Sequence, residues 1–378
     1  MPSHFSQRQD LSLLYKLNSL LIKRSLLKPY EHILLSISGG QDSVSLFFLL
    51  HRLSYNWNWQ VSIIHCDHKW HSNSVGQAKH IARLALQMNI NYYQAICTTN
   101  VNTEDRARKW RYEVIRRISI FHGYTVILTG HTATDRIESF FLHLTRGTGS
   151  NGFHSLSWKR RLNSLLTIFY FTKSNIFLHL KYICFQEYKK KILLTKANNT
   201  LNIIRPLLSI TRTQNTRFIQ KWNLYLWLDI SNNSNKIKRN RIRHQLIPYL
   251  RQKFNLNIDS LLNNWIEIVH SESLYLENII EYIMFAICEK QHHKYDTISI
   301  QFLLTLPIAI QRRILQRFLC MNIKQQISFE HIEQIRVSYG INKLSLKNSD
   351  TILIYLPGDN LVQINQYCVR IFIKNARQ

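Results

Sequence analysis

Short apolar runs alternate with longer stretches of helical periodicity along the first 150 residues. The apolar runs predict buried strands over residues 32–38, 59–67, 91–98 and 124–130. The stretches between them predict helices over residues 44–53, 75–89, 104–121 and 134–144. Strands separated by such helices pair in parallel through right-handed crossovers. The pattern therefore predicts an α/β fold, with a Rossmann-like open parallel sheet and helices on both faces.

The rest of the chain follows a different pattern. Residues 201–208 predict a further strand, residues 209–222 a helix, and the chain beyond them is mainly helical in character. Alternating runs around "PGDN" predict a small β tail at the end. A length of 378 residues exceeds what one core usually holds. We therefore expect one domain over residues 1–225 and a mainly helical C-terminal region over residues 226–378.

Composition narrows the class of protein. No apolar run approaches the roughly 20 residues that a membrane helix needs, so no membrane segment is expected. The first 30 residues lack a secretory signal and favour an amphipathic helix, with a transit peptide as the minority alternative. Six scattered cysteines without a CxxC pair indicate a reducing compartment. Abundant Ile, Asn and Lys with only 10 Gly favour a plastid-encoded protein of the stroma, with a bacterial cytoplasm as the alternative.

The positive charge is concentrated in the middle of the chain. The formal net charge is +27, and residues 151–260 hold 20 Lys and Arg against 3 Asp and Glu, which is +17 of that total. A solvated basic face explains a few surplus charges but not this concentration. A polyanionic partner is the better explanation, and nucleic acid is the natural candidate. An anionic membrane surface is the competing explanation.

A glycine pair stands between the first predicted strand and its helix. A phosphate-binding P-loop is excluded, because no lysine occurs between residues 29 and 68. Two glycines allow a sharp turn that brings N–H groups close to an anion at the helix N-terminus. A carboxylate beside phosphate requires a cation, and Mg²⁺ meets that need. A tight turn without ligand is the alternative. The candidate ATP-binding residues are Ser38, Gly39, Gly40, Gln41, Asp42 and Ser43.

A second glycine-rich stretch is a decoy. "GTGSNG" at residues 147–152 satisfies the dinucleotide fingerprint GxGxxG. It follows a predicted helix rather than a strand, so the required context is absent. We expect a loop there and no NAD site.

The loop at residues 38–43 resembles the pyrophosphatase loop (PP loop) of the N-type ATP pyrophosphatases, which cleave ATP between its α and β phosphates. Further blocks, in order and spacing, resemble the tRNA(Ile)-lysidine synthetase family. These blocks lie at residues 65–74, 102–112, 128–149, 203–208 and 228–248.

The resemblance implies a ligase that uses ATP and Mg²⁺. It would activate C2 of the wobble cytidine in a CAU-anticodon isoleucine tRNA, and free L-lysine would displace AMP to form lysidine. Asp135 and Glu138 lie three apart on one helix face, where they could hold the lysine ammonium or act as base. Asp42 would serve the departing pyrophosphate, and the resemblance places Arg111 and His131 near the reacting phosphate and base. Helix-start acids and a strand-end packing histidine are the alternatives.

The basic segment 236–244 would contact tRNA phosphates, with a solvated helix end as the alternative. Nearby aromatic residues could stack bases, although core packing is the favoured explanation: Trp222, Tyr225 and Trp227. The expected tRNA-binding residues are Arg205, Arg239, Asn240, Arg241 and Arg243.

Two features depart from the family pattern. Thr134 and Arg136 flank Asp135 where the family usually has a second aspartate and a glutamine, which removes a carboxylate and adds a cation. Residues 155–195 have the character of an insertion. A PP-loop tRNA thiolase and a non-catalytic RNA-binding protein with a decayed site are the alternative functions, and the sequence leaves the oligomeric state open, a homodimer included.

Overall fold

The structure is a computed structural model that divides into two compact units, Met1–Val269 and His270–Gln378, which are described separately. The first contains the predicted α/β domain and the second the C-terminal sheet. The structure describes residues 4–70, 73–97, 103–147, 156–162, 169–170, 182–185, 191–192, 201–227, 238–291, 294–323, 325–345 and 351–372.

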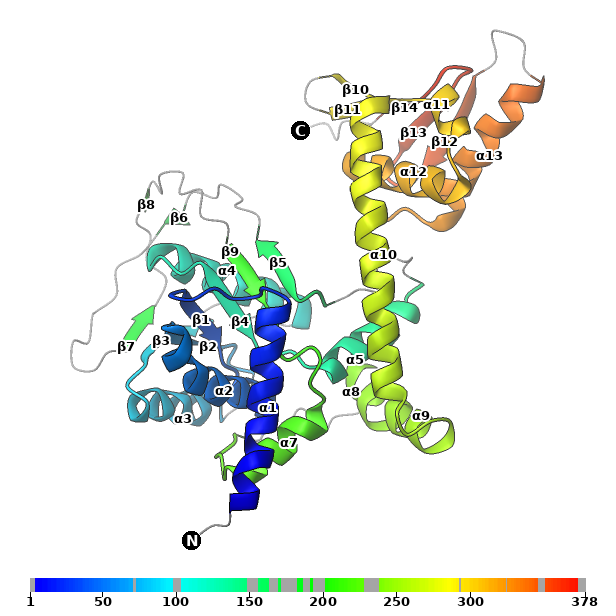
Figure 1. Ribbon diagram of the computed structural model, residues 1–378. Coiled ribbons are helices and arrows are strands. Elements are labelled where there is room, and N and C mark those ends of the chain that lie inside the picture. Colours follow the sequence, from blue (N-terminus) through cyan, green and yellow to red (C-terminus); the bar gives the residue numbers. More distant parts are fainter. Residues whose placement is uncertain are drawn as a thin grey trace. The chain divides into compact units, whose positions relative to one another are not determined.

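A seven-stranded sheet forms the centre of the first unit, in the order β5-β9-β4-β1-β2-β3-β7 (Figure 1). All neighbouring pairs are parallel except β5 with β9, so the expected parallel sheet is confirmed with one antiparallel edge. The strands are β1 (His32–Ser36), β2 (Gln60–Asp67), β3 (Asn91–Ile96), β4 (Val126–Thr129), β5 (Lys159–Leu162), β7 (Tyr182–Phe185) and β9 (Leu201–Ile204).

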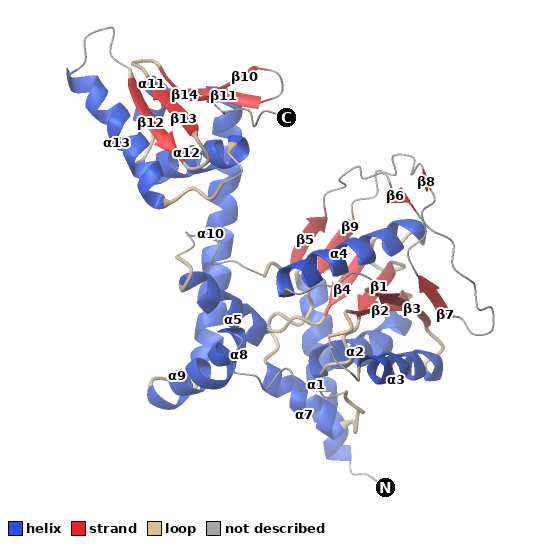
Figure 2. Ribbon diagram, turned by 180° about the vertical axis from the view of Figure 1, so that it is seen from behind, coloured by secondary structure: helices blue, strands red, loops and turns tan. Residues whose placement is uncertain are grey.

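Helices cover both faces of this sheet, as expected (Figure 2). Apolar residues of α1, α2, α3 and α7 pack on one face, and those of α4 pack on the other. The helix after β1 begins earlier than predicted, so the second half of the glycine loop forms its first turn. The helices are α1 (His4–Lys23), α2 (Gln41–Trp57), α3 (Ser74–Gln87), α4 (Glu104–Phe121), α5 (Ala133–Leu144) and α7 (Arg212–Lys221).

The segment interpreted as an insertion contributes to both edges of the sheet. Strand β5 pairs with β9 at one edge, and β7 pairs with β3 at the other. Two further strands, β6 (Phe169–Tyr170) and β8 (Lys191–Ile192), pair only with each other. Strand β9 ends at Ile204, short of the predicted limit, because Pro206 lacks the N–H that a ladder needs.

The unit boundary lies later than the one expected after residue 225. A cluster of Ile137, Phe140, Ile242, Ile247 and Ile266 packs the elements after residue 238 against α5. These elements therefore belong to the catalytic unit. They are α8 (Lys238–Arg241), a π-helical turn η2 (Ile242–Leu246), α9 (Ile247–Lys253) and the first part of α10 (Ile258–Ile287).

The second unit combines an antiparallel sheet, in the order β10-β11-β14-β13-β12, with helices. The predicted β tail is confirmed, and Gly358 and Asp359 take positive φ in its tight turn. Two strands lie where only helix was expected. The elements are β10 (Cys288–Gln291), β11 (Lys294–Ser299), α11 (Ile300–Thr305), α12 (Ile308–Asn322), α13 (Phe329–Ser345), β12 (Ile352–Leu356), β13 (Asn360–Ile364) and β14 (Cys368–Phe372).

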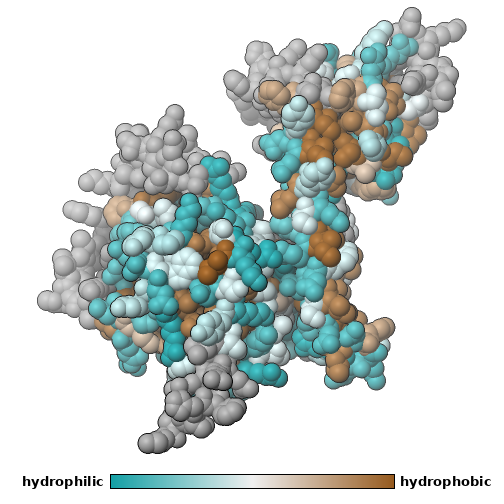
Figure 3. Space-filling model, viewed as in Figure 1, coloured by the Kyte–Doolittle hydropathy of each residue, from teal (hydrophilic) through white to brown (hydrophobic). Residues whose placement is uncertain are grey.

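Within the described residues, no helix combines the length and apolarity needed to cross a bilayer. Hydrophilic side chains cover much of the catalytic unit in the view of Figure 3. Apolar side chains reach the surface around α9 and the start of α10, where Phe254 and Leu256 are exposed.

Candidate active site

The PP loop joins β1 to α2 through a left-handed glycine. Gly39 has φ +81°, a conformation that favours glycine. The Ser43 hydroxyl donates to the Gly40 carbonyl at 2.9 Å and lies 3.3 Å from the Ser38 hydroxyl. These contacts hold the turn in shape at the N-terminus of a 17-residue helix. The loop therefore has the geometry to receive an anion at the helix N-terminus.

Strand β4 ends against this loop at a glycine that cannot be replaced without displacement. A Cβ on Gly130 would lie 2.8 Å from Ser43 Cα and 2.9 Å from Ser43 N, both backbone atoms. Gly130→Ala should therefore shift the PP loop and lower the rate of ATP cleavage roughly a hundredfold, because small misplacements of reacting groups cost that much. Gly340→Ala is the control, since its Cβ would meet nothing within 4 Å. Equal ATP cleavage rates in the two variants would contradict this role of Gly130.

Helix α7 supports the loop from the other side. Gln41 Nε2 donates to the Arg212 carbonyl at 3.0 Å and to Thr216 Oγ1 at 2.8 Å. Asn215 Nδ2 donates to Asp42 Oδ1 at 2.9 Å, and Asn215 is fully buried. Arg212, Asn215 and Thr216 were not predicted from the sequence. Their only signal was a polar side chain on the inward face of a short helix.

Asp42 lies in an environment that favours its neutral form. Burial, together with repulsion from the nearby Asp135 carboxylate, raises the pKa of the Asp42 carboxyl to about 6, although the Asn215 hydrogen bond opposes the change. A divalent cation between phosphates and these carboxylates would relieve both effects. Oxygen ligands from one or two carboxylates together with phosphates are what Mg²⁺ prefers, so the residues fit that ion.

Asp135 and Glu138 are both held by arginines. Asp135 Oδ1 accepts from Arg239 at 2.8 Å, and Glu138 accepts from Arg239 Nε at 2.7 Å and from Arg243 Nε at 2.5 Å. The Glu138 side chain has no exposed surface. Burial raises the pKa of Asp135, but Arg239 and its other partners lower it more, so the net shift is downward and the carboxylate stays charged. The two carboxylates, which we call the acidic pair, thus bind the side chains of two arginines.

Asp135 also has a second, local function. Its Oδ2 accepts from Thr132 N at 2.9 Å, and the Thr132 hydroxyl accepts from Asp135 N, which forms a capping box at the start of α5. The alternative explanation, that Asp135 is a helix-start acid, is therefore correct for Oδ2. The other oxygen, Oδ1, accepts from the arginines.

His131 follows strand β4, whereas Arg111 lies on helix α4. His131 at the end of β4 lies 3.0 Å from Thr129 Oγ1, and burial lowers the pKa of its imidazole to about 3 despite the nearby Asp135. Arg111 on α4 lies 3.0 Å from Nε2 of His68, which follows β2. Burial and Arg111 lower the pKa of His68 to about 4. Both imidazoles are neutral at pH 7, and His68 was not singled out from the sequence although it stands in "HCDH".

The expected tRNA-binding residues divide into two groups. Arg241 has an exposed side chain, whereas Arg205 is 2 % exposed and donates to the Ser157 carbonyl at 2.8 Å. Asn240 is buried as well, and Arg239 and Arg243 hold the acidic pair described above. In this structure, Arg241 alone of the five presents an exposed side chain.

The two residues beside Asp135 that depart from the family pattern, Arg136 and Thr134, have structural explanations. Arg136 is fully buried and donates to Glu267 at 2.7 Å, and Glu267 also accepts from Trp158 and Arg24. The added cation therefore ties α5 to α10 rather than entering the site. Thr134 Oγ1 accepts from Arg212 N at 3.3 Å, which joins α5 to α7.

The comparisons with known proteins agree with this geometry. The family described as "PP-loop domain" matches residues 10–250. The chain is 43% identical to a chloroplastic tRNA(Ile)-lysidine synthase of Zygnema circumcarinatum, over 95% of this chain and 90% of that protein. It is 33% identical to a tRNA(Ile)-lysidine synthase of Nostoc sp., over 82% of this chain and 84% of that protein.

Among solved structures, the U34-tRNA thiolase NcsA from Methanococcus maripaludis matches 71% of this chain and 81% of its own. Its TM-score is 0.50 at 13% sequence identity, so the likeness concerns the fold alone. The sequence relatives are far more similar. The chain belongs to the tRNA(Ile)-lysidine synthase family of PP-loop proteins.

Proposed function

We propose that this protein is an ATP-dependent ligase that joins lysine to C2 of the wobble cytidine in a CAU-anticodon isoleucine tRNA. The observation that carries the proposal is the proximity of two unlike sites. The PP loop can receive phosphate, and the acidic pair Asp135 and Glu138 can hold a cation. The mutual repulsion that raises the pKa of Asp42 indicates that the Asp42 and Asp135 carboxylates are close. A reaction between a phosphate-activated base and an amine needs both sites in one crevice.

The first step uses the PP loop. Cytidine O2 attacks the α-phosphate of ATP, the bond between the α-phosphate and pyrophosphate breaks, and the base is adenylated. Helix α2 and the serine hydroxyls stabilise the pyrophosphate as it leaves. Mg²⁺, which Asp42 would hold, would neutralise charge on the phosphates.

The second step uses the acidic pair. The lysine ammonium would take the position that the guanidinium groups of Arg239 and Arg243 occupy on Asp135 and Glu138. After proton loss to a carboxylate, the amine nitrogen attacks C2, and AMP leaves with the C2 oxygen. Neutral His131 can accept or donate a hydrogen bond at the reacting base or phosphate. Displacement of the arginines is thus a requirement for lysine to bind.

The basic middle of the chain supports tRNA as the acceptor. Residues 151–260 carry +17, and Arg241 presents an exposed cation between Arg239 and Arg243 in the sequence. Several of the similar proteins, including that of Zygnema circumcarinatum, are named chloroplastic, which supports a plastid stroma as the location.

The test is transfer of labelled lysine to tRNA. Purified protein with ATP, Mg²⁺ and an isoleucine tRNA should place label in the RNA and produce AMP and pyrophosphate. A tRNA thiolase would consume ATP without incorporating lysine, and a decayed binding protein would bind tRNA without cleaving ATP. Either result would exclude the ligase.

A further inference from the structure

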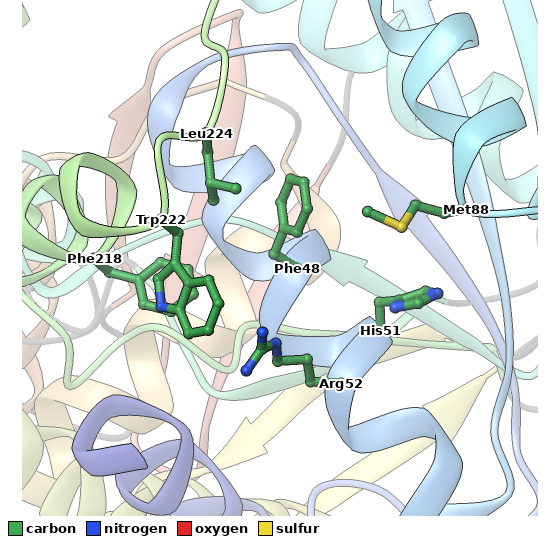
Figure 4. Close-up of a pocket in the computed structure, with 7 residues that line it drawn as sticks. All are labelled: Phe48, His51, Arg52, Met88, Phe218, Trp222 and Leu224. Carbon is green, nitrogen blue, oxygen red and sulfur yellow. The ribbon is translucent and has the colours of Figure 1, made fainter. Parts of the chain in front are cut away.

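A groove on the surface of the catalytic unit is lined by residues outside the PP loop and the acidic pair. Its two parts measure about 560 and 340 Å³ and share Phe48 and Leu224, so they are continuous. In the larger part, Trp222 and Leu224 lie on one side of Phe48, and Met88 and His51 lie on the other (Figure 4). We call this the α2–α3 groove, lined by Phe48, His51, Arg52, His80, Arg83, Leu84, Gln87, Met88, Phe218, Trp222, Asn223, Leu224 and Tyr225.

The charged lining of the α2–α3 groove is entirely of one sign. His51 and Arg52 line the larger part, and His80 and Arg83 line the smaller. None of the described residues that line either part is an aspartate or glutamate. Arg52 and Arg83 are exposed, so their charges are available to a partner in solution. Such a groove is complementary to a polyanion.

Two aromatic rings in the groove differ, because Tyr225 presents its ring to solvent whereas Trp222 packs against the core. Tyr225 is 76 % exposed. The Arg52 guanidinium lies 3.8 Å over the Trp222 ring. The Trp222 Nε1 donor is buried and meets no hydrogen-bond partner in the described part of the chain. The exposed ring of Tyr225 is therefore the one that can stack with a nucleobase.

One end of the groove adjoins the PP loop. Trp227 packs so closely on Gly76 that a Cβ there would lie 2.6 Å from the indole ring. Gln77, the next residue, donates to the Ser38 carbonyl at 2.5 Å. His80, one turn further along α3, lies 6.4 Å from the Trp227 ring. Helix α3 therefore links the PP loop, which Gln77 contacts, to the groove, which His80 lines.

We propose that the α2–α3 groove binds unpaired nucleotides of the RNA substrate. A base stacks on Tyr225, and phosphates pair with Arg52 and Arg83. Aromatic faces between the basic groups favour nucleotides over an acidic peptide, which needs no stacking surface. This inference rests on the proposed function, because it takes RNA to be the substrate.

The test compares two substitutions that act on different parts of RNA. Tyr225→Ala should raise the Kd for tRNA roughly tenfold and leave the salt dependence unchanged, because stacking on an aromatic ring carries no charge. Arg83→Glu should raise the Kd and reduce the slope of log K against log salt by about 1–2, since phosphate contacts release counterions. Filter binding of unmodified isoleucine tRNA over a series of salt concentrations measures both.

Two matched variants serve as controls. Tyr55→Ala removes a tyrosine that is 88 % exposed on α2, and Lys79→Glu reverses an exposed charge on α3, and neither residue lines the groove. Both should bind tRNA as the wild type does. If the groove variants also bind like the wild type, while the wild type binds tRNA and incorporates lysine, only this inference fails. If the wild type neither binds tRNA nor incorporates lysine, the proposed function fails instead.

Discussion

Asp42→Asn should abolish pyrophosphate release while making the folded protein more stable at pH 8. The substitution keeps the shape of the side chain and its contact with Asn215 but removes the charge. We expect the rate of pyrophosphate release to fall at least about a hundredfold, because charged groups aimed at developing charge contribute that much. Binding of tRNA should be nearly unchanged. Equal loss of tRNA binding and pyrophosphate release would contradict the role assigned to Asp42.

The stability effect follows from the raised pKa. The Asp42 carboxyl titrates near pH 6 in the folded state and near its ordinary value of 3.8 in the unfolded state. The unfolded state therefore binds fewer protons between these values, and the cost of the carboxylate grows as the pH rises through this window. Asp42→Asn should raise the free energy of unfolding by about 1–3 kcal/mol at pH 8 and by much less at pH 4. Urea unfolding at both pH values measures the difference, and a constant difference would contradict the raised pKa.

Glu138→Gln should weaken both the fold and the use of lysine. Glu138 is fully buried and holds Arg239 and Arg243 together with Asp135. Removing its charge leaves two guanidinium groups with one carboxylate, and breaking a buried ion pair costs about 3–5 kcal/mol of the free energy of unfolding. The KM for lysine should rise at least tenfold, since about 1.4 kcal/mol of lost binding suffices for that.

A second cluster in the chain provides the control. Glu333 in the second unit also binds two arginines, Arg312 and Arg336, but this cluster lies at the surface, where the Arg312 side chain is 41 % exposed. Glu333→Gln should cost much less stability than Glu138→Gln, because water screens exposed ion pairs. It should not change the KM for lysine. Similar decreases in the free energy of unfolding of the two variants, measured by urea unfolding, would contradict the claim that burial makes the Glu138 ion pairs more stabilising than exposed ones.

The parts of the fold that follow from local periodicity could be predicted from sequence. The strands β1 to β4 and the helices between them have apolar runs and helical stretches of ordinary length. The edge strands β5 and β7 could not be predicted, because residues 153–200 show no clear period. Pairing of β7 with β3 and of β5 with β9 depends on contacts between distant parts of the chain. Such contacts leave no local pattern.

The residues of the site also divide into those that could be predicted from the sequence and those that could not. The PP loop could be predicted because glycines, Asp42 and the change from strand to helix stand together in one short stretch. The partners of the acidic pair could not, because Arg239 and Arg243 stand in a basic segment that looks uniformly suited to RNA. Burial separates them from Arg241, and burial of single residues in such a segment is not readable from composition. Arg136 is a similar case. It is adjacent to Asp135 in the sequence, but its side chain forms an ion pair with Glu267, which is distant in the sequence.

The most direct test of the account is the incorporation of labelled lysine into tRNA. With ATP and Mg²⁺, the protein should place one lysine on each CAU-anticodon isoleucine tRNA and form one AMP for each lysine. A tRNA whose wobble cytidine is replaced by uridine should accept none, and Glu138→Gln should reduce incorporation at low lysine concentration. Absence of label in the RNA, under conditions in which the protein binds both ATP and tRNA, would contradict the account.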